Sequence, residues 1–226
     1  DPATGEASRF EAAGSGLNEL ALLPDGRVLA SRYGAAGGGT GSVVVLDSEG
    51  DIEAELPLAS TEDVVAAAKS LAYDPVRQVV WVNTDLVPGS GGANRHDARV
   101  LELATGRAIL RIETPELHFL RFGDDGRGFF AWQQGSRLAL RMTQPGAAVD
   151  ASSGREIVLD DAFADGHDFV QDLRVEADGR AVVTRWSGVV HVVDGSGGVR
   201  TVTLPRGTEG GLYYTAAAIG DRHRAV

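Results

Sequence analysis

Residues 120–130 read LRFGDDGRGFF: an apolar run, a short turn containing Asp124, Asp125 and Gly126, and a second apolar run. Asp and Gly tolerate the positive φ angles of tight turns, so this stretch predicts a strand, a turn and a second strand. The same order of residue types occurs at 20–30 (LALLPDGRVLA), 71–81 (LAYDPVRQVVW), 173–183 (LRVEADGRAVV) and 216–226 (AAAIGDRHRAV). The turns recur about every 50 residues, which is close to the length of one blade in a β-propeller.

A second hairpin follows most of these strand pairs. Short alternating segments joined by Gly-containing turns lie at 42–56, 99–112 and 189–204, and a pair with a longer loop lies at 137–159. Each repeat therefore has four strands, which we call A to D in chain order. This pattern predicts an all-β fold, a β-propeller of four-stranded antiparallel blades.

The repeats number four full blades and part of a fifth within a single domain. The predicted blades cover residues 17–58, 69–114, 117–160, 171–205 and 213–226. An N-terminal strand at 8–12 could complete the fifth blade and close a five-bladed ring, or the chain could be a fragment of a larger propeller. A short helix is expected at 61–69, where Thr61 can cap an Ala-rich segment.

Two segments of the second repeat carry a resemblance to known proteins. Residues 79–84 (VVWVNT) and 99–106 (RVLELATG) resemble the repeat of the YVTN, NHL and gluconolactonase (SMP-30-like) propellers. The likeness covers nearly the whole chain but its motifs are generic. In the gluconolactonase-like enzymes, Glu, Asn and Asp side chains hold a divalent metal in the central channel.

That resemblance implies a metal site for a cation such as calcium. Glu19 and Asp172 match the positions of the Glu and of an Asp, and carboxylates are suitable ligands for calcium. Lys69 and His118 stand where that family would offer Asn, which weakens the match. A metal-dependent lactonase-type hydrolase is therefore the alternative function, and otherwise no cofactor is expected.

The long connections between strands gather on one face. In a propeller the B–C and D–A connections share the top face, and the long loops at 34–41, 60–69, 86–97 and 160–169 are all of these kinds. Loops on a rigid scaffold commonly carry function, although they can also be tolerated insertions. The first residues of each strand A should line the channel mouth on this face and form a ligand-binding site. The predicted site contains Asn18, Glu19, Lys69, His118, Asp172, Tyr213 and Tyr214.

The net charge of the chain bears on which classes of partner it can bind. Lys and Arg number 21 against 32 Asp and Glu, a net charge of −11, so nucleic acid is not an expected partner. No apolar run is long enough to insert into a membrane. The chain begins at Asp1 without a methionine; if that end is a processed one, export to the periplasm or outside the cell is favoured, and otherwise the compartment is open. The favoured function is non-enzymatic binding of a partner protein or a small polar ligand through the top face.

Overall fold

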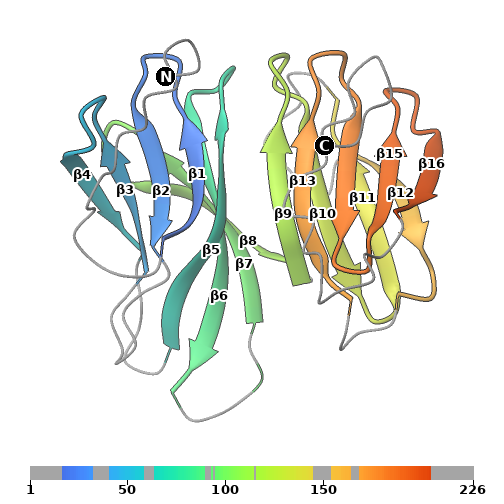
Figure 1. The fold of residues 1–226 in the computed structure, drawn as a ribbon. Helices are drawn as coiled ribbons and strands as arrows, with labels where there is room; N and C mark the ends of the chain where they lie inside the picture. Colours follow the sequence, from blue (N-terminus) through green and yellow to red (C-terminus); the bar gives the residue numbers. More distant parts are fainter. Residues whose placement is uncertain are drawn as a thin grey trace, which may run out of the picture.

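The described residues of the computed structural model form four antiparallel sheets, each of four strands (Figure 1). The structure describes residues 17–32, 41–58, 64–89, 93, 95–114, 116–144, 154–163 and 168–204. Within these ranges every regular element is a strand, and no helix long and apolar enough to cross a membrane is found there. In each sheet the strands lie side by side in chain order, as the repeat predicts.

Each sheet is one blade, with strand A first and strand D last. The first blade contains β1 (Leu17–Leu22), β2 (Val28–Arg32), β3 (Ser42–Leu46) and β4 (Ile52–Pro57). The second contains β5 (Val64–Asp74), β6 (Val79–Pro88), β7 (Arg95–Glu102) and β8 (Ala108–Thr114). The third contains β9 (Glu116–Phe122), β10 (Gly128–Gln134), β11 (Arg137–Met142) and β12 (Arg155–Asp160). The fourth contains β13 (Val170–Val175), β14 (Ala181–Arg185), β15 (Val189–Val193) and β16 (Val199–Thr203).

The A–B turns show why the repeated Asp-Gly pair matters. Gly26, Gly126 and Gly179 have φ angles of 90°, 73° and 81°, a region that side chains rarely adopt. In the first of these turns the Oδ1 atom of Asp25 accepts a hydrogen bond from the backbone N–H of Arg27 at 3.1 Å. The third and fourth blades repeat this bond, so one local motif reverses the chain in three of the four blades.

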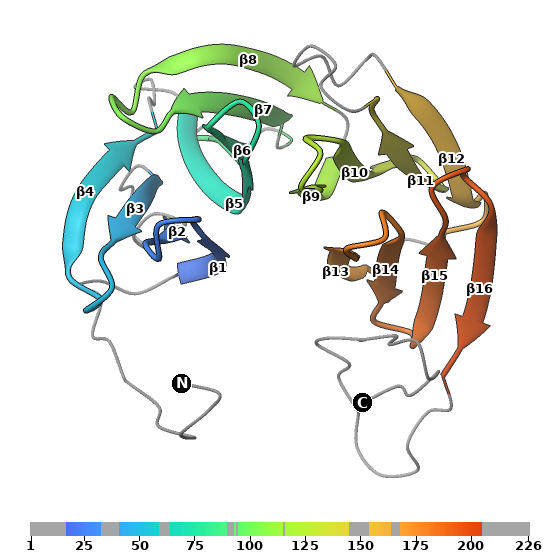
Figure 2. The same ribbon diagram turned by 90° about the horizontal axis from the view of Figure 1, so that it is seen from above.

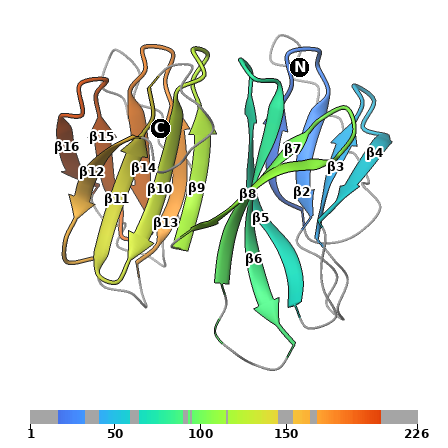
Figure 3. The ribbon, with the colours of Figure 1, turned by 180° about the vertical axis from the view of Figure 1, so that it is seen from behind.

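The blades stand around a common axis. Figure 2 shows the A strands β1, β5, β9 and β13 innermost and the D strands outermost, with no described strand between the first and fourth blades. Seen from behind, the second and third blades stand side by side (Figure 3). The A strands begin on the conventional top face, which is the lower edge of Figure 1, where β5 and β6 reach beyond the other strands. The A–B turns lie on the opposite, bottom face.

The core consists of the contact surfaces between neighbouring blades. One apolar cluster joins the first and second blades, a second joins the second and third, and a third joins the third and fourth. Trp81 and Phe130, which meet edge-on at 5.5 Å, are central to the second of these. Two smaller clusters lie on the far faces of the first and fourth blades.

The all-β propeller prediction is confirmed, whereas the helix expected at 61–69 is wrong. Residues from Val64 onward belong to β5, which pairs with β6 from Val64–Pro88 to Asp74–Val79. Pairing along this long hairpin buries the Ala-rich segment and overrides its helical propensity. The predicted strands at 8–12 and 213–226, and with them the fifth blade, lie outside the described residues.

Candidate functional site

Each of the four described A strands carries a β-bulge at the same level. In β1 the extra residue is Asn18, because Leu17 pairs with Arg32 while Glu19 pairs with the adjacent Ser31. The equivalent extra residues in the other blades are Lys69, His118 and Gln171. A bulge leaves one residue unpaired and redirects its side chain, and bulges are frequent beside binding and active sites. Four polar residues from four blades are therefore the extra residues of their bulges, at the same level of their A strands.

The bulged residues make different contacts. Asn18 Nδ2 donates to the Ala68 carbonyl at 3.1 Å, which links the first blade to the second. Lys69 Nζ lies 3.9 Å from Asp85 Oδ1, and the same carboxylate oxygen lies 2.8 Å from His96 Nδ1. These contacts place a mixed-charge group of Lys69, Asp85 and His96 on the second blade, near the top face.

His118 is turned toward its own blade. Its side chain is buried, with Nε2 3.1 Å from Gln133 Oε1 and the ring 6.5 Å from the ring of Phe163. A buried imidazole with an amide partner and an aromatic neighbour supports the local packing of the third blade. The structure therefore gives His118 a surrounding unlike that of Lys69, although the bulge is the same.

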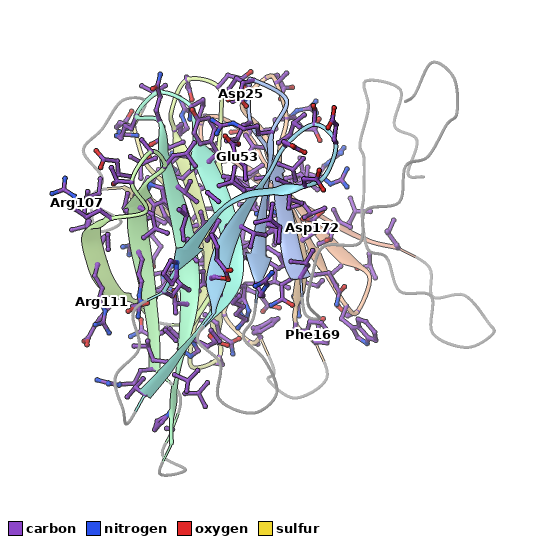
Figure 4. The ribbon with its side chains drawn as sticks, turned by 90° about the vertical axis from the view of Figure 1, so that its left-hand side faces the viewer. Asp25, Glu53, Arg107, Arg111, Phe169 and Asp172 are labelled. Atoms are coloured by element: carbon purple, nitrogen blue, oxygen red, sulfur yellow. The ribbon has the colours of Figure 1, made fainter. Side chains whose placement is uncertain are left out.

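Glu19 and Asp172 meet across the axis through a third residue, Arg121. The guanidinium of Arg121 donates to Glu19 Oε1, and its Nη2 lies 3.5 Å from Asp172 Oδ1. The other oxygen of Glu19 accepts the backbone N–H of Leu71 at 3.0 Å, and the other oxygen of Asp172 accepts from Arg174 at 2.9 Å. All four blades thus contribute to this group, which we call the axial ion cluster: Glu19, Arg121, Asp172 and the Leu71 N–H. Figure 4 shows Asp172 between Asp25 of a bottom-face turn and Phe169 near the top face.

Burial dominates the electrostatics of Glu19. It raises the pKa of Glu19 above the ordinary value of 4.5, and the charge and hydrogen bond of Arg121 only partly offset this. The nearby Asp172 adds to the rise because it carries a like charge. The interactions with Arg121 and the Leu71 N–H therefore only partly offset the desolvation of this carboxylate.

A second buried ion cluster joins the third and fourth blades. Arg185, whose side chain is 8% exposed, binds Asp160 at 2.6 Å and also Asp168, and its guanidinium lies over the Phe163 ring at 4.7 Å. In the same region His191 is buried, with Nδ1 3.1 Å from Thr201 Oγ1. Burial, and then the positive charge of Arg185, lower the pKa of His191 to about 4.

The predicted site residues that the structure describes therefore divide into three groups. Glu19 and Asp172 are brought together, but through Arg121. Asn18 and Lys69 lie near the junction of the first and second blades, and His118 packs within the third. Tyr213 and Tyr214 lie outside the described residues.

The sequence reasoning missed Arg121 and the Asp85–His96 pair. Arg121 had a weak signal, because the equivalent positions hold Ala21 and Ala72 in the first two blades but Arg174 in the fourth. A charged residue on an innermost strand needs a partner, and that partner is found across the axis. The Asp85–His96 pair depends on the register of β6 and β7, where the two residues lie opposite each other.

Comparisons with known proteins identify the fold. No family model matches this sequence, and no curated protein matches it. Among solved structures, the Dos1 propeller is similar with a TM-score of 0.58 at 12% identity, over 88% of this chain and 50% of that one. An exo-β-1,3-galactanase from Phanerochaete chrysosporium has a TM-score of 0.56 at 8% identity, over 86% and 52%. Virginiamycin B lyase from Staphylococcus aureus has a TM-score of 0.50 at 14% identity, over 84% of this chain and 56% of that one.

This chain spans about half the length of each of these proteins. The galactanase and the lyase are named for different activities, and a shared fold does not transfer an activity. Four blades around one axis, with their cores between neighbouring blades, and the likeness to these structures lead to one conclusion: the chain has the β-propeller fold.

Proposed function

We propose that the chain is a non-catalytic propeller that binds a partner protein or a small polar ligand at its top face. The observation that supports the proposal is the bulge in each of the four described A strands, whose extra residues at one level are Asn18, Lys69, His118 and Gln171. The half-buried Lys69 carries a positive charge, and Asp85, which contacts both Lys69 and His96, carries a negative one. A polar or zwitterionic ligand matches such a group, because each charged atom needs a partner once water is expelled.

The alternative is the metal-dependent lactonase-type hydrolase, with a divalent cation such as calcium held by Glu19 and Asp172. Arg121 weighs against it, since its guanidinium already lies between the two carboxylates. A cation would compete with this guanidinium for the same oxygens, and like charges repel. Binding without catalysis is therefore the better supported function.

Calcium titration separates the two functions. Isothermal titration of the wild-type protein should show no stoichiometric calcium binding. Arg121→Met removes the guanidinium and leaves two converging carboxylates, so calcium should raise the melting temperature of this variant more than that of the wild type. One bound calcium in the wild type, together with hydrolysis of a lactone, would replace the binding proposal with the hydrolase.

The top face is tested with a library of small zwitterionic and polar compounds. Compounds that raise the melting temperature of the wild type should lose their effect in Lys69→Ala. Arg107→Ala is the control, because Arg107 is exposed beside a C–D turn on the bottom face. If Lys69→Ala retains every response, or if no compound acts on the wild type at millimolar concentration, small-ligand binding at this face is refuted.

A further inference from the structure

Two neighbouring cavities open on the bottom face, opposite the proposed ligand site. One, of about 410 Å³, lies along the inner strands of the first, second and third blades at their A–B turns. The other, of about 490 Å³, lies between the A–B turns of the third and fourth blades. Phe122 and Asp124 line both, so the two cavities adjoin at the third blade. We call the adjoining pair the bottom groove; each part is within the size range of ligand sites.

The part over the first and second blades is apolar. Leu20 and Leu22 line it and are 62% and 72% exposed, the highest values among the large apolar side chains of the described residues. Leu71, Tyr73 and Pro75 form the wall on the second blade. Large aliphatic side chains left in water beside a cavity favour contact with an apolar partner. Arg121 also lines this part, but its charge is already bound by Glu19.

The part between the third and fourth blades combines an apolar floor with acidic sides. Its floor includes Phe122, Phe129 and Val175. Its acidic residues are Asp124, Asp125, Glu176 and Asp178. Asp125 and Asp178 pair with the arginines that follow them in their turns, at 3.8 Å and 2.6 Å. Within the described residues Asp124 and Glu176 have no ion pair, so the groove carries negative charge that its own arginines leave uncompensated.

We propose that the bottom groove binds a peptide segment of a partner protein in which basic and apolar side chains alternate or adjoin. A lysine or arginine can lay its aliphatic stem along Phe122 and Val175 and place its charge beside Asp124 and Glu176. Neighbouring apolar side chains of the same segment then cover Leu20 and Leu22. The net charge of −11 attracts such a segment from solution as well. This surface is separate from the top face, so the peptide proposal can be tested independently of the proposed function.

The test uses labelled peptides and fluorescence polarisation. The probe is an eight-residue peptide of alternating Lys and Leu. Two comparison peptides replace either every Lys by Glu or every Leu by Ser. Wild-type protein should bind the Lys-Leu probe at least tenfold more tightly than either comparison peptide, and more weakly as salt rises. Spermidine, a polycation without apolar side chains, should compete poorly.

Variants locate the binding. The pair Asp124→Asn with Glu176→Gln should weaken binding of the probe about tenfold, and Leu22→Ser should weaken it severalfold. The control pair, Glu49→Gln with Glu113→Gln, removes two exposed acidic charges outside the groove and should leave the affinity unchanged. Circular dichroism verifies that each variant remains folded.

Several results would overturn the proposal. Equal losses in the groove pair and the control pair would show general attraction to an acidic protein. Equal binding of the Lys-Ser peptide, or full competition by spermidine, would show that a polycation rather than an amphipathic segment is recognised. Absence of binding by every peptide at millimolar concentration would exclude the groove as a peptide site.

Discussion

His191 should make the stability of this propeller fall when the solution is acidified. The imidazole is 2% exposed, its Nε2 finds no hydrogen-bond partner among the described residues, and burial lowers its pKa from 6.5 to about 4. Arg185 acts in the same direction, while Asp160 and Asp168 act against it. In the unfolded chain the imidazole takes up a proton near its ordinary pKa, whereas the folded protein keeps it neutral until about pH 4.

The sign and size follow from this difference. Between the two pKa values the unfolded state binds more protons, so stability present above about pH 6.5 is lost as the pH falls toward 4. The free energy of unfolding should decrease by about 2 kcal/mol between about pH 7.5 and pH 5, and by about 3 kcal/mol by pH 4. These values are contributions of His191 alone, and titrating carboxylates add their own.

The assay is urea unfolding of the wild type and of His191→Gln at several pH values. Each protein is compared with itself across pH, so any loss caused by the substitution cancels. The pH dependence of the wild type should be steeper by about the amounts given above. Equal slopes in the two proteins would refute the reasoning, because they would mean that folding does not change the pKa of this imidazole.

Three further predictions concern the turns and the chain end. Gly126→Ala should lower the free energy of unfolding by about 2 to 4 kcal/mol, because its new Cβ would lie 2.8 Å from Val76 Cγ2 at a positive φ. The control, Gly26→Ala, meets no atom within 4 Å and should lower it by only about 1 kcal/mol, so equal losses in the two variants would contradict the steric argument. Asp74→Ala should cost about 3 kcal/mol in chemical denaturation, because this buried carboxylate accepts two backbone N–H groups and an arginine; a loss below 1 kcal/mol would show that the turn holds without it. Deleting residues 1–12 should lower the melting temperature sharply if the strand at 8–12 completes a fifth blade, and an unchanged melting temperature would show that it does not.

The repeat could be predicted because its signals are local. The Asp-Gly pairs at 25–26, 125–126 and 178–179 require positive φ at the glycine, and alternation of apolar residues defines the strands on either side. Both signals depend on a few neighbouring residues. The four-stranded blades and the order of their strands follow from them with little further information.

The site was harder to predict because it depends on contacts between blades. Glu19 and Arg121 lie 102 residues apart, and only the rotation of one blade against another brings them together. Sequence reasoning placed Glu19 near the axis but could not find the partner that neutralises it. The helix expected at 61–69 failed for a related reason: the strand from Val64 is formed by pairing with residues as far away as Pro88.

The way the apolar clusters join only adjacent blades has a consequence for how the molecule opens. Among the described residues, the second and third blades each share clusters with two neighbours, whereas the first and fourth share a large cluster with one neighbour each. Stability in such an array is close to a sum of nearest-neighbour terms, so a terminal blade can detach while the central pair stays intact. Amide protons of β6 and β10 should therefore exchange with solvent much more slowly than those of β3 and β15. Under a pulling force, the chain should lengthen in steps of one blade at a time rather than in a single event.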